Sequence, residues 1–201
     1  ISYEMSHFQY IGDWMTSGHN IVRKDKAIPI DNEWFYDEEK GHKRLWELLD
    51  FESPRNEIEE RIMKSIEWVG KAYGEEDESV ALLEISFAFE TLLKNDEKAI
   101  INSSIVASLS ESYAFINGRS VDERIRLESE FKKFYSERSG MVHGGKEKLS
   151  NTDINPYEMI TKTIRNVLVN PNFCDCKNMS DLTALFKKMK YSLSEDVNQI
   201  E

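Results

Sequence analysis

The sequence predicts an all-α protein with an antiparallel four-helix-bundle core and additional N- and C-terminal helical segments. Four stretches between residues 54 and 144 repeat apolar residues at three- and four-residue steps, the period of one face of an α-helix. The connections between them are short, and no stretch alternates convincingly with period two, as a half-buried strand would. A length of 201 residues suits one main domain with appendages.

The first two helices of the bundle are expected at about 54–73 and 77–94. Ser53 supplies a capping hydroxyl and Pro54 suits the first helical position, while Gly74 closes the helix. The second helix has so wide an apolar stripe that we expect it at the centre of the bundle.

The third and fourth helices are expected at about 97–117 and from 120 onward. Asn117 and Gly118 tolerate the left-handed conformation that often ends a helix, and Ser120 with Glu123 forms a capping box for the next one. The fourth helix turns Leu127, Phe131 and Phe134 inward. Further helices are predicted at 156–169 and from Ser180 and Asp181 onward.

These patterns divide the chain into three parts. Residues 1–52 form an aromatic-rich, extended or partly helical lead-in that docks its aromatics on the core. Residues 53–146 form the bundle, and residues 147–201 form helices that pack on it. Because the chain begins at Ile1 without an initiator methionine or a signal sequence, we expect an upstream domain of the same polypeptide.

Composition narrows the class of partner. With 26 basic and 37 acidic residues the formal net charge is -11, so any RNA-binding surface must be local. The apolar stretch 80–93 is too short and too charged to span a bilayer, and we expect no membrane association. Two cysteines, Cys174 and Cys176, form neither a disulfide framework nor a zinc site, which favours a reducing cytoplasm. Since no phosphate-binding glycine loop occurs either, no cofactor and no metal are predicted.

The segment from Arg138 to His143 carries the most informative chemistry. It places a fixed cation close to a side chain that exchanges protons near pH 7, a combination suited to phosphodiester chemistry. Arg138 continues the inward stripe of the fourth helix, so its guanidinium needs a carboxylate, carbonyls, a solvent-filled cleft or a bound anion. Glu90 is the best partner within the chain. The sequence leaves open whether these two side chains form an internal pair that locks two helices or whether Arg138 binds a ligand.

His143 also has two interpretations. Five residues of continuous helix would turn it about 140° around the axis and about 7.5 Å along it from Arg138. Gly140 can loosen the last turn and Gly144 can end the helix, so that both side chains reach one anion. The alternative is a cation at the helix end that interacts with exposed carbonyls.

Three motifs, in this order, resemble the HEPN superfamily and in particular its Apea-like branch. They are Ile-Glu-Trp-Val-Gly at 66–70, Ala-Phe-Glu-Thr-Leu-Leu at 88–93, and an arginine and a histidine separated by four residues at 138–143. The resemblance covers roughly residues 55 to 150, about half of the chain.

The resemblance implies a metal-independent endoribonuclease that cleaves single-stranded RNA through attack of the ribose 2′-OH, as part of a toxin, phage-defence or stress-response protein. Arg138 would hold the scissile phosphate, His143 would assist proton transfer, and Ser139 and Glu90 would support them. A homodimer would complete a composite cleft from two copies of the motif. Many active members carry a larger polar residue than Ser139 after the arginine, and the family also includes non-catalytic dimerisation, nucleotide-binding or protein-binding modules.

Overall fold

The computed structural model describes residues 2–11, 14–23, 36–49, 54–95, 105–144 and 154–192, with side chains described at 36–49, 54–95, 105–141 and 154–192. Contacts between Cα atoms divide the chain into two compact units, residues 1–36 and 37–201. The second unit therefore begins within the predicted lead-in.

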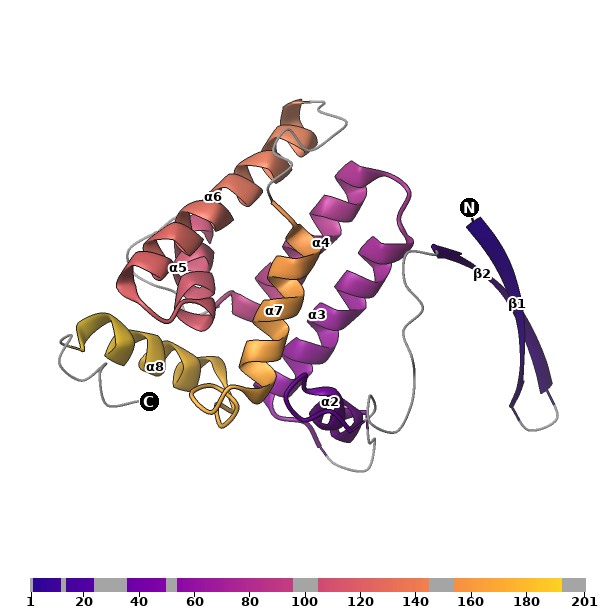
Figure 1. The fold of residues 1–201 in the computed structure, drawn as a ribbon, viewed down its shortest axis with the longest axis horizontal. Coiled ribbons are helices and arrows are strands. Elements are labelled where there is room, and N and C mark those ends of the chain that lie inside the picture. The colour runs from indigo at the N-terminus through magenta and orange to yellow at the C-terminus, as the bar shows by residue number, and fades with distance from the viewer. Residues whose placement is uncertain are drawn as a thin grey trace. The chain divides into compact units, whose positions relative to one another are not determined.

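The first unit contains an antiparallel two-stranded ribbon (Figure 1). Strand β1 (Ser2–Ile11) pairs with β2 (Trp14–Arg23) in a register that runs from Ser2 opposite Arg23 to Ile11 opposite Trp14. The lead-in was expected to be extended or partly helical, and the pairing of these two extended segments into a ribbon was not predicted. Gly12 and Asp13 stand between two runs rich in aromatic and β-branched residues, and this two-residue spacing is a sequence signal for a tight hairpin.

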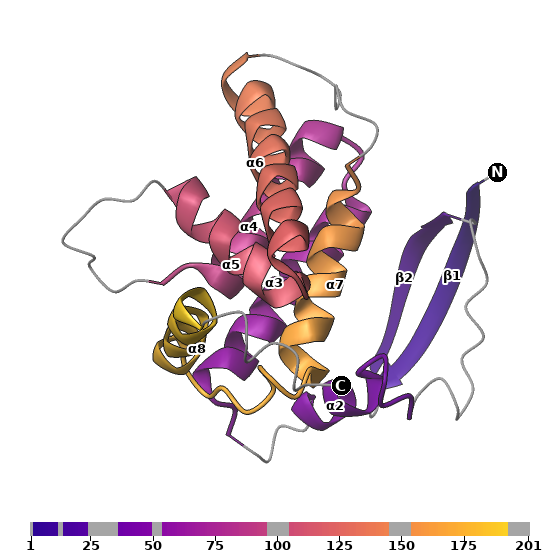
Figure 2. The same cartoon turned by 60° about the vertical axis from the view of Figure 1, so that its left-hand side comes forward.

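In the described residues of the second unit every regular element is a helix, which confirms the predicted all-α class with a helical bundle core. Helix α3 packs against α4 and α5 packs against α6, while α7 contacts α3, α4 and α5 (Figures 1 and 2). The described helices are α2 (His42–Leu48), α3 (Glu57–Gly74), α4 (Glu78–Leu93), α5 (Ile105–Asn117), α6 (Val121–Gly144), α7 (Pro156–Val169) and α8 (Met179–Tyr191). Across these residues, no helix is long and apolar enough to cross a membrane.

The start of α3 differs from the predicted start at Pro54. The Asn56 side chain accepts a hydrogen bond from the Glu59 backbone N–H, and the Glu59 carboxylate accepts one from the Asn56 N–H. This reciprocal capping box satisfies two backbone donors, whereas a serine cap satisfies one. The helix therefore begins three residues later than predicted.

The junction between α5 and α6 also differs in detail. Helix α5 ends at Asn117 as predicted, but without the left-handed conformation that Asn117 and Gly118 tolerate, because among the described residues a positive φ occurs at Gly41 alone. Ser120 accepts from the Glu123 N–H as predicted, but the Glu123 carboxylate accepts from the N–H of Arg119 rather than of Ser120. The predicted start of the third helix, at 97–104, lies outside the described residues.

Buried polar contacts hold this junction against α7. The Asn117 amide nitrogen donates to the Tyr113 carbonyl at 2.9 Å and to the Thr163 hydroxyl at 3.0 Å. The Asn117 amide oxygen accepts from Asn166 Nδ2 at 3.0 Å. Because the side chain is almost fully buried, each of these bonds satisfies a group that water cannot reach.

An aromatic cluster forms the core between α4, α5 and α6. The Phe89 ring is fully buried and its centroid lies 5.0 to 5.9 Å from those of Tyr113, Phe131 and Phe134. Edge-to-face and tilted arrangements of this kind add to the free energy gained by burying the rings. The cluster fixes α6 against α4 one turn before Arg138.

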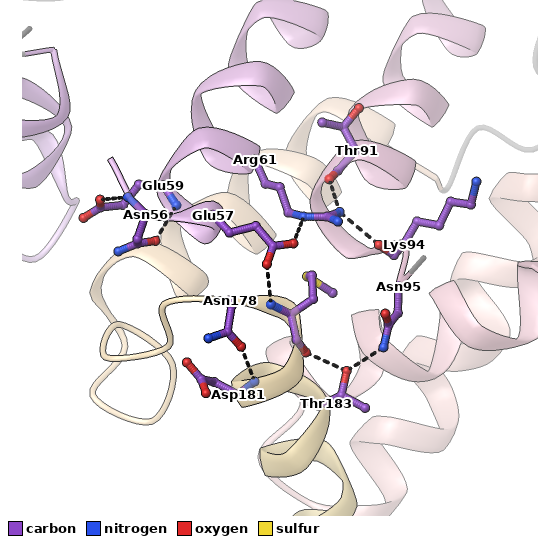
Figure 3. A network of polar contacts seen from close by, with 11 residues as sticks. Asn56, Glu57, Glu59, Arg61, Thr91, Lys94, Asn95, Asn178, Asp181 and Thr183 are labelled. Atoms are coloured by element: carbon purple, nitrogen blue, oxygen red, sulfur yellow. Dashed lines mark hydrogen bonds and ion pairs between the residues drawn. The ribbon is translucent and has the colours of Figure 1, made fainter. Parts of the chain in front are cut away.

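A polar network joins the start of α3, the end of α4 and the start of α8 (Figure 3). Arg61 Nη1 donates to the carbonyls of Thr91 and Lys94, at 3.0 and 2.9 Å, and thereby caps the end of α4. The Glu57 carboxylate accepts from Arg61 Nε at 2.9 Å and from the Met179 N–H at 3.3 Å. The arginine thus ties α3 to α4, and its carboxylate partner extends the tie to α8.

Candidate functional site

Arg138 lies half-buried on α6, at the edge of the core, where the inward stripe of the helix places it. Its Nε donates to the hydroxyl of Ser86 on α4 at 3.3 Å. Its guanidinium carbon lies 5.3 Å from the centroid of the Tyr135 ring, within range of a cation–π contact. One hydroxyl and one aromatic face thus hold the guanidinium beside α4.

Glu90 pairs with Tyr135 and not with Arg138. The Tyr135 hydroxyl donates a hydrogen bond to Glu90 Oε1. Burial, this hydrogen bond and the negative charge of Glu90 all raise the pKa of Tyr135, against a smaller opposing effect of Arg138. The Arg138–Glu90 pair that the sequence allowed therefore does not form. Instead, Tyr135 donates the hydrogen bond of its hydroxyl to Glu90 and presents its ring to the Arg138 guanidinium.

In this arrangement the Arg138 guanidinium keeps N–H donors that no described side chain uses. Over the described side chains, no carboxylate forms an ion pair with Arg138, and its one hydrogen bond uses Nε. A guanidinium has five N–H donors in a planar fork, and the four on its two terminal nitrogens suit an oxyanion such as a phosphate. The arrangement can therefore bind an anion without first breaking an internal salt bridge.

His143 lies on the same helix, which is unbroken from Val121 to Gly144. The expected loosening at Gly140 is therefore wrong, although the helix does end at Gly144 as predicted. An intact helix places the backbone of His143 about 140° around the axis and about 7.5 Å along it from that of Arg138. The imidazole lies outside the described side chains.

Ser139 is exposed on α6. It stands four residues before His143, and residues at this spacing share one face of a helix. Ser139 and His143 therefore lie on one face, whereas Arg138 lies on another. The structure brings Arg138 together with Tyr135, Ser86 and Glu90, and separates this group from the serine–histidine face.

Sequence reasoning identified Arg138 and Glu90 but missed Tyr135, which contacts both, and Ser86, which accepts the hydrogen bond of Arg138. Tyr135 stands three residues before Arg138, and Ser86 stands four residues before Glu90, so each shares a helical face with a predicted site residue. That spacing was a usable signal, although it required knowing that α4 and α6 are neighbours.

A second feature, a shallow groove of about 640 Å³, lies between α3 and α4 and includes Glu90 in its lining. Elsewhere in the described part of the chain, Cys174 and Cys176 are free thiols, and burial raises the pKa of Cys176. No group of three or more potential ligand side chains within the described ranges could hold a metal ion.

Comparisons with family models, with curated proteins and with solved structures found no significant match to this chain.

Proposed function

We propose that the chain is a HEPN-like endoribonuclease module that cleaves single-stranded RNA without a metal ion. The observation that supports this most directly is the state of Arg138, whose guanidinium is held by Ser86 and Tyr135 but not neutralised by a carboxylate of the described residues. A cation held in place with unused donors is what stabilisation of a phosphodiester transition state requires.

In the proposed reaction Arg138 binds the non-bridging oxygens of the scissile phosphate. His143 assists proton transfer as the ribose 2′-OH attacks the phosphorus in line with the departing 5′-oxygen. The bond to the 5′-oxygen breaks as the bond from the 2′-oxygen forms, which yields a 2′,3′-cyclic phosphate and a 5′-hydroxyl. Ser139 shares a helical face with His143 and is the candidate to orient the imidazole, while Glu90 acts through Tyr135 on the position of Arg138.

The geometry of α6 favours a composite site built by a homodimer. The backbone positions of Arg138 and His143 in one chain lie about 140° apart around an intact helix. Two antiparallel copies of α6 would let Arg138 of one chain and His143 of the other address one phosphate. The proposed setting is a cytoplasmic defence or stress-response protein in which an upstream domain controls this module.

The separation of Arg138 and His143 around α6 also supports a second candidate function, a non-catalytic dimerisation, nucleotide-binding or protein-binding module. In that case Arg138 binds an anionic group of a partner and His143 has no catalytic task. A net charge of -11 is compatible with this role.

Cleavage of labelled single-stranded RNA in the presence of a chelator distinguishes the two candidates. Wild type should cleave, and Arg138→Ala and His143→Ala should each lower the rate by a factor of about 100 to 10,000, the range for loss of a charge-stabilising or proton-transfer group. Arg126→Ala is a matched control, because Arg126 is an exposed arginine on the same helix whose partner is Glu130 at 3.4 Å.

The chemical identity of the cleavage products is a second, independent test of the nuclease proposal. Attack by the 2′-OH requires a 2′,3′-cyclic phosphate, and RNA with a single 2′-deoxy substitution at the scissile nucleotide should resist cleavage. If wild type leaves the RNA intact, or if the Arg138 and His143 variants cleave as fast as Arg126→Ala, the nuclease proposal fails and the binding module is preferred.

A further inference from the structure

A groove lies between α3 and α4 in the described part of the chain. It is open to solvent, has a volume of about 640 Å³, and extends along both helices. Side chains in its lining include Arg61, Lys64 and Trp68 from α3, and Phe87, Glu90 and Thr91 from α4. Figure 3 shows one end of it, where Arg61 reaches from α3 to the last turn of α4.

A stripe of cations and one aromatic ring follows the α3 wall and continues one step past it, because Lys71 stands next to the lining rather than in it. Arg61, Lys64, Trp68 and Lys71 stand at steps of three and four residues, so they share one helical face. The Lys71 ammonium lies 4.1 Å from the centroid of the Trp68 ring, and the Phe87 ring lies 5.1 Å from it at an angle of 58°. Basic residues interleaved with aromatic rings are typical of surfaces that bind single-stranded nucleic acid.

The two lysines of this stripe can exchange their present contacts for phosphate. Lys64 pairs with Glu67 at 2.7 Å, but both side chains are more than half exposed, so water and salt screen the pair and it contributes little to stability. Lys71 is exposed and covers one face of Trp68. A base could take the place of the ammonium over the ring while the flexible side chain moves to an adjacent phosphate.

The charge of the groove favours a particular kind of occupant. Its lining contains three basic side chains, Arg61, Lys64 and Lys94, and three acidic ones, Glu57, Glu60 and Glu90. Such a balance gives little attraction for a dense polyanion such as a duplex. It suits a single strand, whose unpaired bases supply stacking energy in addition to a few phosphate contacts.

The groove and the Arg138 cluster share one residue, Glu90. Glu90 belongs to the lining of the groove and accepts the hydrogen bond of Tyr135, whose ring contacts Arg138. A strand that lies in the groove and passes Glu90 therefore comes next to the residue that binds Tyr135, the ring that Arg138 contacts.

We propose that this groove holds the single-stranded RNA next to the scissile phosphate, with a base stacked on Trp68 and neighbouring phosphates on Lys64 and Lys71. The choice of RNA as the ligand rests on the proposed function, whereas the position of the strand rests on the groove. Arg61 is a fixed part of the wall, because the carbonyls at the end of α4 and the Glu57 carboxylate already occupy it.

Binding of the whole chain to 2′-O-methyl RNA tests the position separately from cleavage, because this RNA lacks the attacking hydroxyl. Trp68→Leu should weaken binding by roughly 5- to 100-fold, the range for loss of one base–aromatic stack. Lys64→Ala and Lys71→Ala should each weaken it less and should each reduce the slope of log K against log salt by about 0.7. With Lys64, Lys71 and Arg138 as the contacts, the wild-type slope should be about -2.

Two controls match the variants. Lys132 is an exposed lysine that pairs with Glu128 on α6, outside the groove, so Lys132→Ala should leave both the affinity and the slope unchanged. Trp46 on α2 is about half exposed, and Trp46→Leu should likewise have no effect. The lysine variants keep the proposal testable if Trp68→Leu fails to fold, because their side chains are exposed and outside the core.

The outcomes separate this inference from the proposed function. If the RNA does not bind, or if the groove variants bind as tightly as the two controls, the strand does not lie here, even where Arg138→Ala abolishes cleavage. If the groove variants lose binding while wild type cleaves no RNA, the groove assignment stands and the nuclease proposal fails. Binding with a slope far steeper than -2, retained by Trp68→Leu, would also overturn the stacking geometry.

Discussion

Replacing Arg138 with alanine should lower the free energy of unfolding by only about 1–2.5 kcal/mol. The structure shows two contacts to be lost, a hydrogen bond of 3.3 Å to Ser86 and a cation–π contact with Tyr135. The first contributes about 0.5–1.5 kcal/mol and the second about 0.5–1 kcal/mol. Glu90 keeps its hydrogen bond from Tyr135, so no buried carboxylate loses its partner.

The loss of stability would be larger if Arg138 formed a buried ion pair that held two helices together. Removing one member of a buried ion pair leaves an uncompensated charge and typically costs about 3–5 kcal/mol. Urea unfolding followed by circular dichroism resolves this difference, provided that the slope of free energy against urea concentration does not change between variants. Phe131→Ala sets the upper end of the scale, because Phe131 is fully buried and its truncation should cost about 3–5 kcal/mol.

A loss of 3 kcal/mol or more for Arg138→Ala would refute this reasoning and show that the arginine is mainly structural. A double-mutant cycle adds a direct test of the pairing. Combining Arg138→Ala with Glu90→Gln should give a coupling energy below about 0.5 kcal/mol, since the two charges are not in contact. A coupling well above that value would mean that the two side chains pair in solution and that the anion site is closed.

Three further outcomes follow from the described side chains. Burial is the main cause that raises the pKa of Tyr113 and of Tyr135 above the ordinary value of 10.0. The unfolded chain therefore loses these protons first, and urea unfolding should show stability that is fully present below pH 10 and falls as the pH rises above it. Asn117→Ala should cost about 2–4 kcal/mol in the same assay, because three buried hydrogen bonds are lost together. Gly140→Ala should raise stability by about 0.5–1 kcal/mol and leave RNA cleavage unchanged, since the helix is already straight through this position; a loss of activity would mean that the turn must open.

Sequence periodicity predicted the helices well where burial and local signals agree. The helix expected at 77–94 is α4 at 78–93, and the one expected at 156–169 has those bounds in α7. Both have strong apolar faces that pack on several neighbours. The start of α3 was missed because Pro54 is a conspicuous signal, whereas the stronger cap, Asn56 with Glu59, requires a reading of two residues together.

The hairpin at 2–23 was missed for a different reason. Pairing between two strands depends on their register, which local periodicity does not reveal unless one face is uniformly apolar. Tyr3, Phe8 and Tyr10 do not keep a single alternation, so the period-two signal is weak. The two-residue separation was the remaining signal, and it carries information only when both flanking runs are already regarded as strands.

The sequence predicted that Arg138 and Glu90 belong to the candidate site, but it did not predict which residues they contact. The inward position of Arg138 followed from the helical period, and so did its need for a partner. Whether that partner was Glu90 depended on the rotation of α6 against α4, which the packing of Phe131 and Phe134 on Phe89 decides. This rotation places Tyr135 between Arg138 and Glu90. The periodicity of one helix alone cannot predict such a contact between two helices.

Helix α6 is continuous from Val121 to Gly144, and this limits how Arg138 and His143 could act together in catalysis. One face presents Arg138, anchored to α4 through Ser86, so it moves with the core of its own chain. The backbone positions of Ser139 and His143 lie on another side of α6, whose last residue is Gly144. We propose two routes by which a phosphate bound by Arg138 and the imidazole of a histidine come together: a second chain provides the histidine, or the last turn of α6 opens. Mixing Arg138→Ala with His143→Ala protein decides between these routes. Activity restored in the mixture requires two chains at one site, whereas a mixture that stays inactive although the two variants form heterodimers requires a bend within one.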